Sequence, residues 1–481
     1  MEGRKNKKCK VRLFMLIIFL TVSTTFLPLR SFGGDMEILL DKLVGKGILT
    51  KPEAESILQE MKETKGMEPA EAQKPTAEAQ QAKPEEKKTE PEWVQNLPDW
   101  IKNPPDWIKN IKFSGDLRLR YEYSQRDTTP SDDEERNRGR FRLRVGADTT
   151  ILKDVSVGFG LASGNGDPRS TNQTFDSTFS KKPINIDYAQ AIYTPLPWLL
   201  SKDTPWLSLQ GGKLKNNPIF RANSVGSWPS ELAWDNDITP EGAAAVFNYA
   251  NLLNFEPISL DLFMNDGFFI LAENYPSGSN KEPYFFVVQP GFNLKILKDI
   301  NFKVAGAKYL FNGIQDHQQL QFSSNSNTYN TVGGVNFYKF NYNAWIGSAE
   351  LGFSNPFHQN YVPYVGFFGE YIYNPNANDN RDAYIAGIRV GAPSLKKFAD
   401  WQLEYAYRRL EKDAWLDVFP DSTFYSGATN AKGHKGSIYF GLAKNLFIDF
   451  NYFHAVNIIE FTTRNYKRPE DVFQADIQFN F

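Results

Sequence analysis

Residues 111–123, Ile-Lys-Phe-Ser-Gly-Asp-Leu-Arg-Leu-Arg-Tyr-Glu-Tyr, alternate between apolar and polar side chains. Successive side chains point to opposite faces of a β-strand, so this stretch predicts a strand with one apolar and one polar face. Residues 138–149 repeat the pattern, with Phe141, Leu143 and Val145 on one face and arginines on the other. A period of two therefore decides the fold.

The same period recurs to the end of the chain, and it predicts sixteen strands with no helix of ordinary length between them. Besides the first two, we expect strands near 154–163, 184–194, 205–214, 242–250, 257–266, 283–294, 300–311, 341–353, 362–373, 382–392, 400–410, 434–444, 445–455 and 470–481. Lys303 and Lys308 fall on opposite parities of one strand, so one of them should lie at a strand end or at a bulge.

The connections between these strands are of two kinds. Every second one is short, as at Lys153-Asp154 and Lys298-Asp299. The others are long and polar, except 374–381: they are 124–137, 164–183, 215–241, 267–282, 312–340, 411–433 and 456–469. Short turns at one end and long loops at the other are typical of an outer-membrane β-barrel, whereas a soluble β-sandwich is the alternative fold.

The last strand favours the barrel over the sandwich. Residues 473–481 alternate between apolar and polar side chains, and the chain ends on Phe481. A terminal aromatic residue on an amphipathic strand is a pattern of outer-membrane proteins that are handled by the barrel assembly machinery. The predicted fold class is therefore all-β, a transmembrane antiparallel barrel of about sixteen strands.

The composition agrees with this fold and excludes others. The chain has 481 residues, of which 41% are hydrophobic, 15% aromatic and 23% charged, with a net charge of -2 and a mean hydropathy of -0.47. A polytopic helical membrane protein needs several apolar runs of about 20 residues, which are missing from this sequence. The charge balance argues against nucleic-acid binding, and the single cysteine, Cys9, excludes an intrachain disulfide.

The residues before the barrel divide into four segments. Residues 1–34 have a basic start, a short apolar run and small residues, which predicts a secretory signal peptide; a single membrane anchor is the alternative. Residues 35–64 predict two short helices that associate or dock, with a marginal helix without a partner as the alternative, and 65–92 have the composition of a disordered linker. Residues 93–110 repeat Pro-Asp-Trp-Ile-Lys-Asn, which would place Trp100 and Trp107 at a membrane interface before the barrel of 111–481. Packing of this repeat on the barrel domain is the alternative.

Three segments also resemble a known family. They are Gly115–Glu122, Trp234–Gly242, and Glu404–Arg408 with the following Glu411–Ala414 and Phe419–Phe424. These segments are similar to those of the putative porin family of Gram-negative outer-membrane β-barrels, and the resemblance covers about residues 93–481. It implies an outer-membrane channel for the passive diffusion of small hydrophilic solutes or ions, and it names no particular solute.

In such a barrel the polar faces line a water-filled lumen, and loop 215–241 is the third long loop, which commonly folds inward in sixteen-stranded porins. The basic candidates for the lining are Arg118, Arg120, Arg140, Arg142, Arg144, Arg389 and Arg408. The acidic candidates, on the wall or in that loop, are Asp235, Asp237, Glu241, Glu350, Glu370 and Glu404. The interfacial aromatic candidates are Trp100, Trp107, Phe479 and Phe481.

Two interpretations of these charges remain open. A basic wall opposite an acidic loop would create a transverse field that favours polar and charged solutes. Alternatively, the arginines pair with Asp116, Glu122 and Asp148 and only hold the wall together. We expect weak anion preference or little selectivity, because an arginine cluster stands in a chain that is acidic in total.

The remaining expectations concern partners and alternatives. The four histidines are scattered without ligand spacing, so we expect no metal, no cofactor and no enzyme. The expected partners are outer-membrane lipid, the barrel assembly machinery and small hydrophilic solutes, with a homotrimer by analogy and no nucleic acid. The N-terminal segment would be periplasmic. An outer-membrane anchor tethered by the N-terminal helices and a hydrolase at the barrel mouth are the alternative functions.

Overall fold

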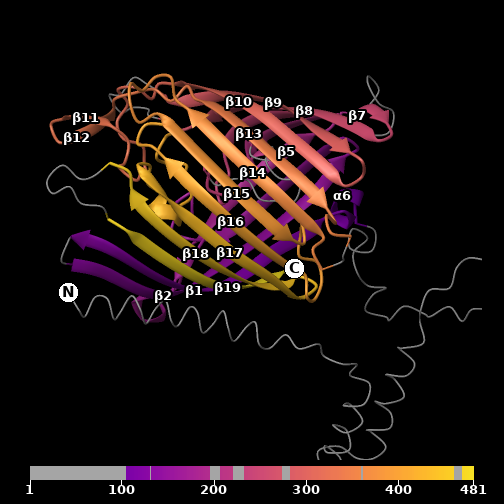
Figure 1. Cartoon of the computed structure of the whole chain (residues 1–481), viewed down its shortest axis with the longest axis horizontal. Coiled ribbons are helices and arrows are strands. Elements are labelled where there is room, and N and C mark those ends of the chain that lie inside the picture. Colours follow the sequence, from indigo (N-terminus) through magenta and orange to yellow (C-terminus); the bar gives the residue numbers. More distant parts are fainter. Residues whose placement is uncertain are drawn as a thin grey trace, which may run out of the picture. The chain divides into compact units, whose positions relative to one another are not determined.

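The computed structural model describes residues 104–129, 132–195, 206–219, 232–273, 282–358, 361–459 and 468–481. The predicted signal peptide, helical segment and linker lie outside these residues, as does Trp100. The described part begins with a one-turn helix, α6 (Asp106–Lys109), and continues into one large sheet (Figure 1). None of the helices in this part is long and apolar enough to cross a membrane.

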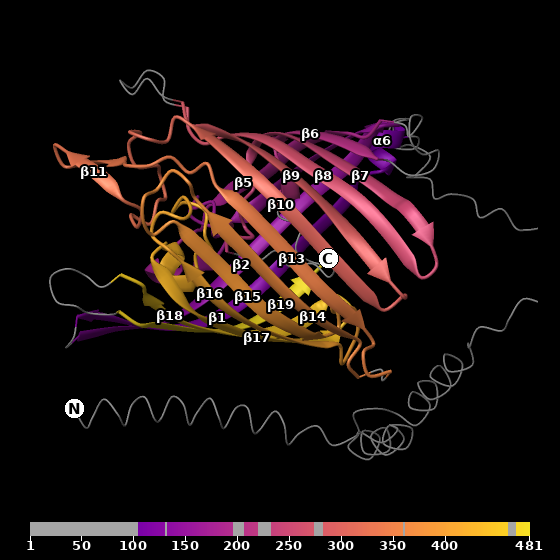
Figure 2. The ribbon, with the colours of Figure 1, turned by 45° about the horizontal axis from the view of Figure 1, so that its top comes forward.

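The sheet closes into an antiparallel barrel in which the strands follow chain order (Figures 1 and 2). Its sixteen strands are β1 (Lys112–Thr129), β2 (Asp132–Leu152), β3 (Val155–Ser163), β5 (Ile184–Tyr193), β6 (Leu207–Lys213), β7 (Glu241–Phe255), β8 (Ile258–Ile270), β9 (Tyr284–Ile296), β10 (Ile300–Asn312), β13 (Trp345–Ser354), β14 (Tyr364–Tyr373), β15 (Asp382–Gly391), β16 (Trp401–Leu410), β17 (Ala431–Ala443), β18 (Leu446–Asn457) and β19 (Glu470–Asn480). The last strand pairs with the first, with Arg118 opposite Gln478.

Three shorter strands accompany the barrel. The two-residue strand β4 (Gln173–Thr174) pairs with β2. Strands β11 (Tyr329–Val332) and β12 (Val335–Tyr338) form a separate hairpin that projects from the long-loop end of the barrel (Figure 2). The closed antiparallel barrel of sixteen strands confirms the predicted architecture, and the alternation of short and long connections is also as predicted.

One predicted loop is wrong. Residues 124–137 were expected to connect two strands, but β1 continues to Thr129 and β2 begins at Asp132. Opposite charges face each other across this extension, with Arg126 opposite Glu134. The extension is polar on both faces, and the apolar alternation that marks a half-buried strand is therefore missing from its sequence.

The two lysines of β10 are accommodated without a bulge. The register between β10 and β13 is unbroken from Ile300 to Lys308, and Lys308 is the last residue of that pairing. It lies opposite Trp345, with its Nζ atom 4.4 Å from the centre of the indole ring. Lys308 nevertheless lies inside β10, which continues to Asn312 in its pairing with β9, so the prediction that one lysine lies at a strand end or at a bulge is wrong.

The outer face of the barrel carries the apolar parity of the strands. Large side chains such as Phe113, Phe159 and Phe367 are exposed there. Phe479 and Phe481 at the end of the chain are exposed as well, and so is Trp107 in α6. This coat is the surface that an amphipathic barrel strand presents to its surroundings.

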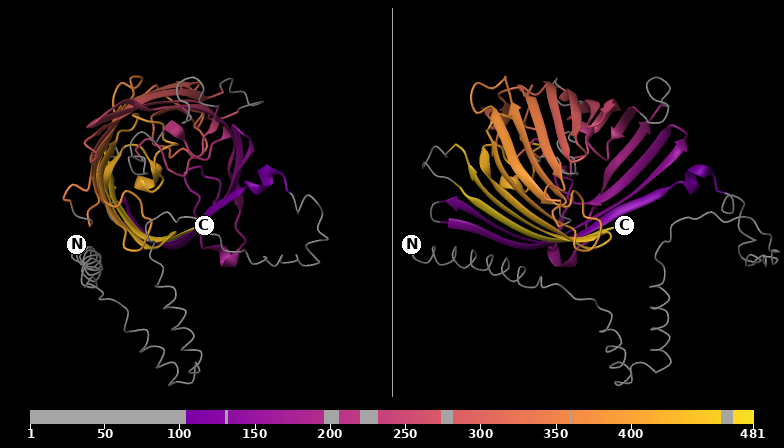
Figure 3. Two further views of the ribbon diagram at one scale, coloured as in Figure 1. Left: turned by 90° about the vertical axis from the view of Figure 1, so that its right-hand side faces the viewer. Right: turned by 45° about the vertical axis from the view of Figure 1, so that its right-hand side comes forward.

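The interior is only partly polar, contrary to the expectation that apolar side chains lie outside. Seen along the barrel, segments between the strands lie inside the ring (Figure 3, left). Loop side chains pack there against inward side chains of β8, β9 and β10, all of them buried. We call the following six rings the aromatic core: Trp234, Phe285, Tyr309, Phe311, Trp415 and Phe419.

The sequence around residue 286 explains why the aromatic core was not anticipated. Residues 284–288 read Tyr-Phe-Phe-Val-Val and are apolar on both parities. Phe285 and Val287 point inward and are buried, whereas Phe286 and Val288 are exposed on the outer face. A strand that is apolar on both faces needs apolar partners on both sides, and the inward loops supply them.

Candidate functional site

Arginines from two neighbouring strands are concentrated on one side of the interior. The register of β1 and β2 places Arg118 opposite Arg142, and Arg120 opposite Arg140. Arg144 lies opposite Asp116. We call Arg118, Arg120, Arg140, Arg142 and Arg144 the arginine wall. Like charges directly opposite each other repel, so this arrangement requires acidic partners.

Acidic side chains on the same strands and on β19 supply these partners. Asp116 accepts hydrogen bonds from Nε of Arg142 and Nε of Arg144, both at 2.7 Å. Asp476 accepts two from Arg120, at 2.7 and 2.6 Å. Bidentate pairs of this kind fix the direction of a guanidinium group.

Glu122 completes the pairing on the wall. It accepts from Nε of Arg138 at 2.6 Å and from Nη1 of Arg140 at 3.3 Å. The expectation that wall acids pair with the arginines is therefore correct for Asp116 and Glu122. It is wrong for Asp148, whose carboxylate instead accepts a hydrogen bond from Lys215 at 2.6 Å.

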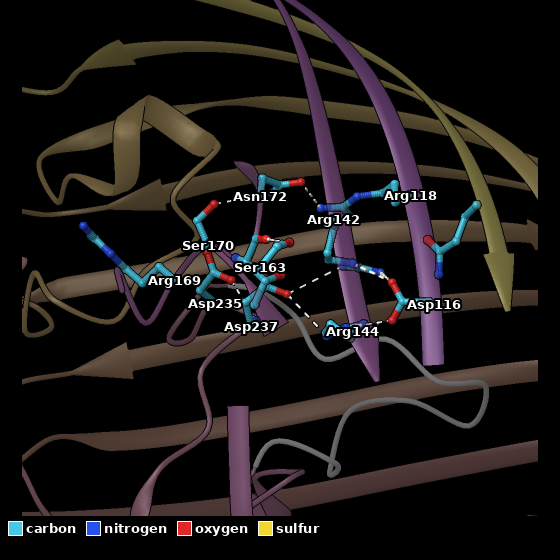
Figure 4. A network of polar contacts seen from close by, with 12 residues as sticks. Asp116, Arg118, Arg142, Arg144, Ser163, Arg169, Ser170, Asn172, Asp235 and Asp237 are labelled. Atoms are coloured by element: carbon cyan, nitrogen blue, oxygen red, sulfur yellow. Dashed lines mark hydrogen bonds and ion pairs between the residues drawn. The ribbon is translucent and has the colours of Figure 1, made fainter. Parts of the chain in front are cut away.

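The acidic loop lies against the arginine wall and not across an opening from it (Figure 4). One carboxylate oxygen of Asp237 is 3.7 Å from Nη1 of both Arg142 and Arg144. The amide and hydroxyl of Thr171 donate to the same residue, each at 3.1 Å. The opposite charges of loop and wall, which were predicted to face each other across the lumen, are therefore in direct contact at this point.

The two aspartates of this loop have opposite electrostatic environments. Burial would raise the pKa of Asp237, but Arg142 and Arg144 outweigh that effect and lower the pKa to about 2. Burial, followed by the nearby carboxylates of Asp421 and Asp237, raises the pKa of Asp235 well above its ordinary value. Two carboxylates two residues apart therefore differ in how readily they take up a proton.

A cavity of 450 Å³ is lined by residues of the arginine wall and of these loops. Its lining includes seven basic side chains, which are Arg118, Arg120, Arg142, Arg144, Arg169, Lys215 and Lys435. It also includes seven acidic ones, which are Asp187, Asp235, Asp237, Glu404, Asp421, Asp449 and Asp476. The cavity is highly charged, yet its formal charges balance.

A second cavity, of 580 Å³, continues along the same wall. It includes Arg126, Arg138 and Arg140 in its lining, and it shares Asn172, Ser422 and Thr423 with the first cavity. At this junction Nη2 of Arg118 donates to Oδ1 of Asn172 at 2.7 Å (Figure 4). The two cavities therefore adjoin at Asn172, Ser422 and Thr423, next to Arg118.

Four further predicted residues lie inside the barrel on other strands. Arg389 donates to Glu404 at 3.1 and 2.9 Å, and its Nη1 atom is 3.8 Å from Glu350. Glu370 accepts a hydrogen bond from Ser348 at 2.9 Å. All are buried, and of these only Glu404 lines the 450 Å³ cavity.

Two predicted residues have other surroundings. Arg408 is buried, with its guanidinium carbon 4.3 Å from the ring centre of Phe424. Glu241 was expected in the acidic loop, but it is the first residue of β7, where it is exposed and lies 3.1 Å from Lys213. The strand begins one residue earlier than its small and apolar residues indicate, which removes Glu241 from the loop.

Several charged residues of the site were missing from the sequence-based candidates. Asp476 and Asp449 are on the inward parity of β19 and β18, and Lys435 is on that of β17. The strand alternation contains this signal. Arg169 and Lys215 come from loops, whose folding inward the alternation does not report. Among the described residues, no group of histidine, aspartate or glutamate is arranged to hold a metal ion.

Comparison with known proteins gives one family and several similar folds. The family described as "Putative porin" matches residues 124–343 and 339–481. OprB of Pseudomonas putida is similar in structure, at 12% identity over 78% of this chain and 95% of that chain, with a TM-score of 0.48. The outer-membrane channel DcaP of Acinetobacter baumannii matches at 11% identity over 77% and 97%, with a TM-score of 0.42. OmpF of Salmonella typhi, in complex with daunomycin, matches at 11% over 77% and 98%, with a TM-score of 0.42. No curated protein matches the sequence.

Proposed function

This chain belongs to the putative porin family, and we propose that its water path runs along the arginine wall. The protein is an outer-membrane porin, a channel for the passive diffusion of small hydrophilic solutes. The observation that carries the proposal is the pair of polar cavities that share Asn172, Ser422 and Thr423. The aromatic core occupies another part of the interior, so the path is off-centre.

The balanced lining predicts a channel with little charge selectivity. Seven basic and seven acidic side chains line the 450 Å³ cavity, and burial with the neighbouring Asp421 and Asp237 raises the pKa of Asp235, which favours its neutral form. The remaining imbalance favours anions weakly. The reversal potential of the purified protein in a planar bilayer under a potassium chloride gradient tests this. We expect a value near zero or slightly on the chloride side, and a strong cation preference would overturn the proposal.

The orientation follows the usual layout of outer-membrane barrels, in which the turns are periplasmic and the longer loops extracellular. We propose that the long-loop end faces outward, and that the N-terminal segment and the turn at Lys298 face the periplasm. The last strand, ending on Phe481, would be the element handled by the barrel assembly machinery. Labelling of whole cells with a membrane-impermeant maleimide should modify Val332→Cys but not Lys298→Cys, and the reverse pattern would refute this orientation.

Asp266 on β8 supports an oligomer. Asn265 next to it points inward and donates to Gln289 at 3.0 Å, so Asp266 points outward, between Met264 and Phe268. Its Oδ1 atom is buried and has no hydrogen-bond partner among the described residues. A carboxylate on the lipid-facing side of a barrel is unfavourable, because hydrocarbon offers it no hydrogen-bond donor.

The surroundings of Asp266 fit a protein partner better than lipid. Ala245 and Val288 are its cross-strand neighbours, and Ala243 follows on the same outward face of β7. Lys213 and Glu241 form an ion pair at the neighbouring strand ends. We therefore propose that the outer face of β6–β8 contacts a second copy of the chain, in a homotrimer.

Replacing the carboxylate distinguishes a partner from lipid by the sign of the effect. If lipid covers β8, Asp266→Leu should stabilise the barrel and leave its mass in detergent unchanged. If a partner subunit donates to Asp266, the same substitution should lower the trimer fraction measured by light scattering. Met264→Leu, two residues away on the same face, is the matched control and should change neither quantity.

A further inference from the structure

A third cavity differs chemically from the two along the arginine wall. It has a volume of 430 Å³ and is lined by side chains from β5, β6, β7, β8 and β10 and from the segment that follows β6. It shares Asn216 with the 450 Å³ cavity. The side chain of Asn216 therefore borders both the charged cavity and this one.

Side-chain amides dominate this lining. Five of the ten lining residues are carboxamides, namely Gln190, Gln210, Asn216, Asn248 and Asn265. Among the described residues of the lining there is no carboxylate, and Lys303 is the only charged side chain. The 450 Å³ cavity has fourteen charged side chains, so the difference is one of chemistry and not only of position.

Several of these amides retain unused hydrogen-bonding groups. Oε1 of Gln190 accepts from the backbone amide of Lys215 at 2.8 Å, which leaves the NH₂ group of Gln190. Asn265 donates to Gln289 at 3.0 Å, which leaves the carbonyl oxygen of Asn265. The side chain of Asn248 is exposed and makes no hydrogen bond to another described residue. Each carboxamide offers both donors and acceptors without net charge.

Apolar surface lies beside the amides. Ile192, Val246 and Phe263 belong to the lining, and Nζ of Lys303 is 5.5 Å from the ring centre of Phe263. A ligand that fits has hydroxyl groups at its edges and carbon–hydrogen faces between them. The volume of the cavity, 430 Å³, is within the range of cavities that hold small molecules, about 300–1,000 Å³.

We propose that this cavity, which we call the amide pocket, binds neutral polyhydroxylated solutes of the size of a mono- or disaccharide during their passage. The proposal rests on the channel function and adds the class of solute. Hydroxyl groups both donate and accept hydrogen bonds, as the amides do, and an uncharged solute loses little by leaving the charged path. Charged solutes would instead stay on the arginine wall.

The test is the effect of sucrose on the current of single channels in planar bilayers. Sucrose should reduce the potassium chloride current in a saturable way. In the double variant Asn248→Leu/Gln210→Leu, which keeps the side chains similar in size, the apparent sucrose affinity should fall about tenfold, as expected for the loss of two neutral hydrogen bonds. Gln478→Leu makes the same change in the charged cavity and should keep the affinity of the unsubstituted protein.

The outcomes separate this proposal from the channel function. A protein that conducts potassium chloride but gives no saturable response to sucrose overturns the amide pocket and leaves the channel intact. Equal sucrose affinity in the double variant and the unsubstituted protein also overturns it. Absence of any conductance would contradict the channel itself. The single variant Asn248→Leu, at an exposed position, gives the same test with about half the effect in free energy if the double variant fails to fold.

Discussion

The arginine wall and the aromatic core face the same barrel interior but are stabilised in opposite ways. On the arginine wall, carboxylates such as Asp116 and Asp476 are paired with guanidinium groups beside a cavity. In the aromatic core, rings from two loops pack on inward side chains of the strands, and none is more than 6% exposed. Strand alternation sets which residues point inward, whereas the loops decide which part of the interior stays open.

Acidic residues show the same difference. Asp417 is fully buried in a loop beside the aromatic core, and neutral groups donate hydrogen bonds to its carboxylate. It accepts from the hydroxyl of Ser323 at 2.9 Å, the amide of Ser326 at 2.8 Å and the hydroxyl of Tyr329 at 2.8 Å. A carboxylate held by neutral donors joins loop segments together, whereas one held by arginines also sets the charge of a path.

The largest effect should follow from opening the aromatic core. Trp415 is fully buried, its ring centre is 4.9 Å from that of Tyr309, and its Nε1 atom donates to the carbonyl of Ala233 at 2.6 Å. Trp415→Ala leaves a large void and should lower the free energy of unfolding by about 3–5 kcal/mol. The loops it holds should loosen, so the single-channel conductance should rise and fluctuate.

The control for this variant is a tryptophan on the other face. Trp345 is exposed on the outside of β13, so Trp345→Ala should change the conductance little. Denaturant unfolding followed by tryptophan fluorescence, together with single-channel recording, measures both quantities. If Trp415→Ala keeps the original conductance and stability, the aromatic core does not close that part of the interior.

A smaller loss of stability should follow from Asp417→Asn. The amide keeps one oxygen but replaces the other acceptor with a donor that faces Tyr329 and Ser326. Buried donors left without an acceptor cost about 1–3 kcal/mol. Because no lining of the charged cavities includes Asp417, the reversal potential should stay unchanged. A shift in reversal potential without loss of stability would contradict the division between the two regions.

On the arginine wall, removing one carboxylate should have the reverse signature. Glu122 lines the 580 Å³ cavity and accepts hydrogen bonds from Arg138 and Arg140. Glu122→Gln removes its negative charge and leaves the charge of these two arginines less balanced. One added positive charge about 4 Å from an ion in water is worth about 1 kcal/mol, so the chloride-to-potassium permeability ratio should rise about fivefold. Reversal potentials measure this ratio.

The matched control removes a carboxylate that is paired with a lysine but lines none of these cavities. Glu241→Gln at the start of β7 should leave the permeability ratio unchanged, because Glu241 is exposed beside Lys213. An equal rise in both variants would mean that overall charge, and not the position on the wall, sets the selectivity.

The contrast between the two regions also explains what the sequence could predict. The period of two is imposed by the two faces of each strand, and it gave the sixteen strands and the arginines of β1 and β2. The partners Asp116 and Glu122 lie on the same parity and could be foreseen. Alternation in the sequence shows which side chains share a face, and the pairing of neighbouring strands then brings those side chains into contact.

Loop placement has no such periodic signal. Trp234 and Trp415 are 181 positions apart in the chain, and neither belongs to a strand, although their ring centres are 5.8 Å apart. Residues 284–288 are apolar on both parities, so their sequence does not show which parity faces lipid and which faces the loops inside the barrel. The aromatic core depends on tertiary contacts between distant loops, and those contacts leave no local pattern to read.

The smallest predicted effect is a pH dependence that belongs to the acidic loop. Burial and the neighbouring carboxylates of Asp421 and Asp237 raise the pKa of Asp235, which is held by the amides of Ser422 and Asp237 at 2.8 and 2.9 Å. On acidification, Asp235 takes up its proton before an ordinary aspartate would. Asp237 stays ionised because its pKa is about 2. The net charge of the cavity then becomes more positive by one, so the preference for chloride should increase modestly on acidification.

Asp235→Asn carries the neutral form at every pH, so it should start from the higher chloride preference and lose that part of the pH response. If the reversal potential of Asp235→Asn changes with pH as much as that of the unsubstituted protein, Asp235 is not the group that titrates on the wall.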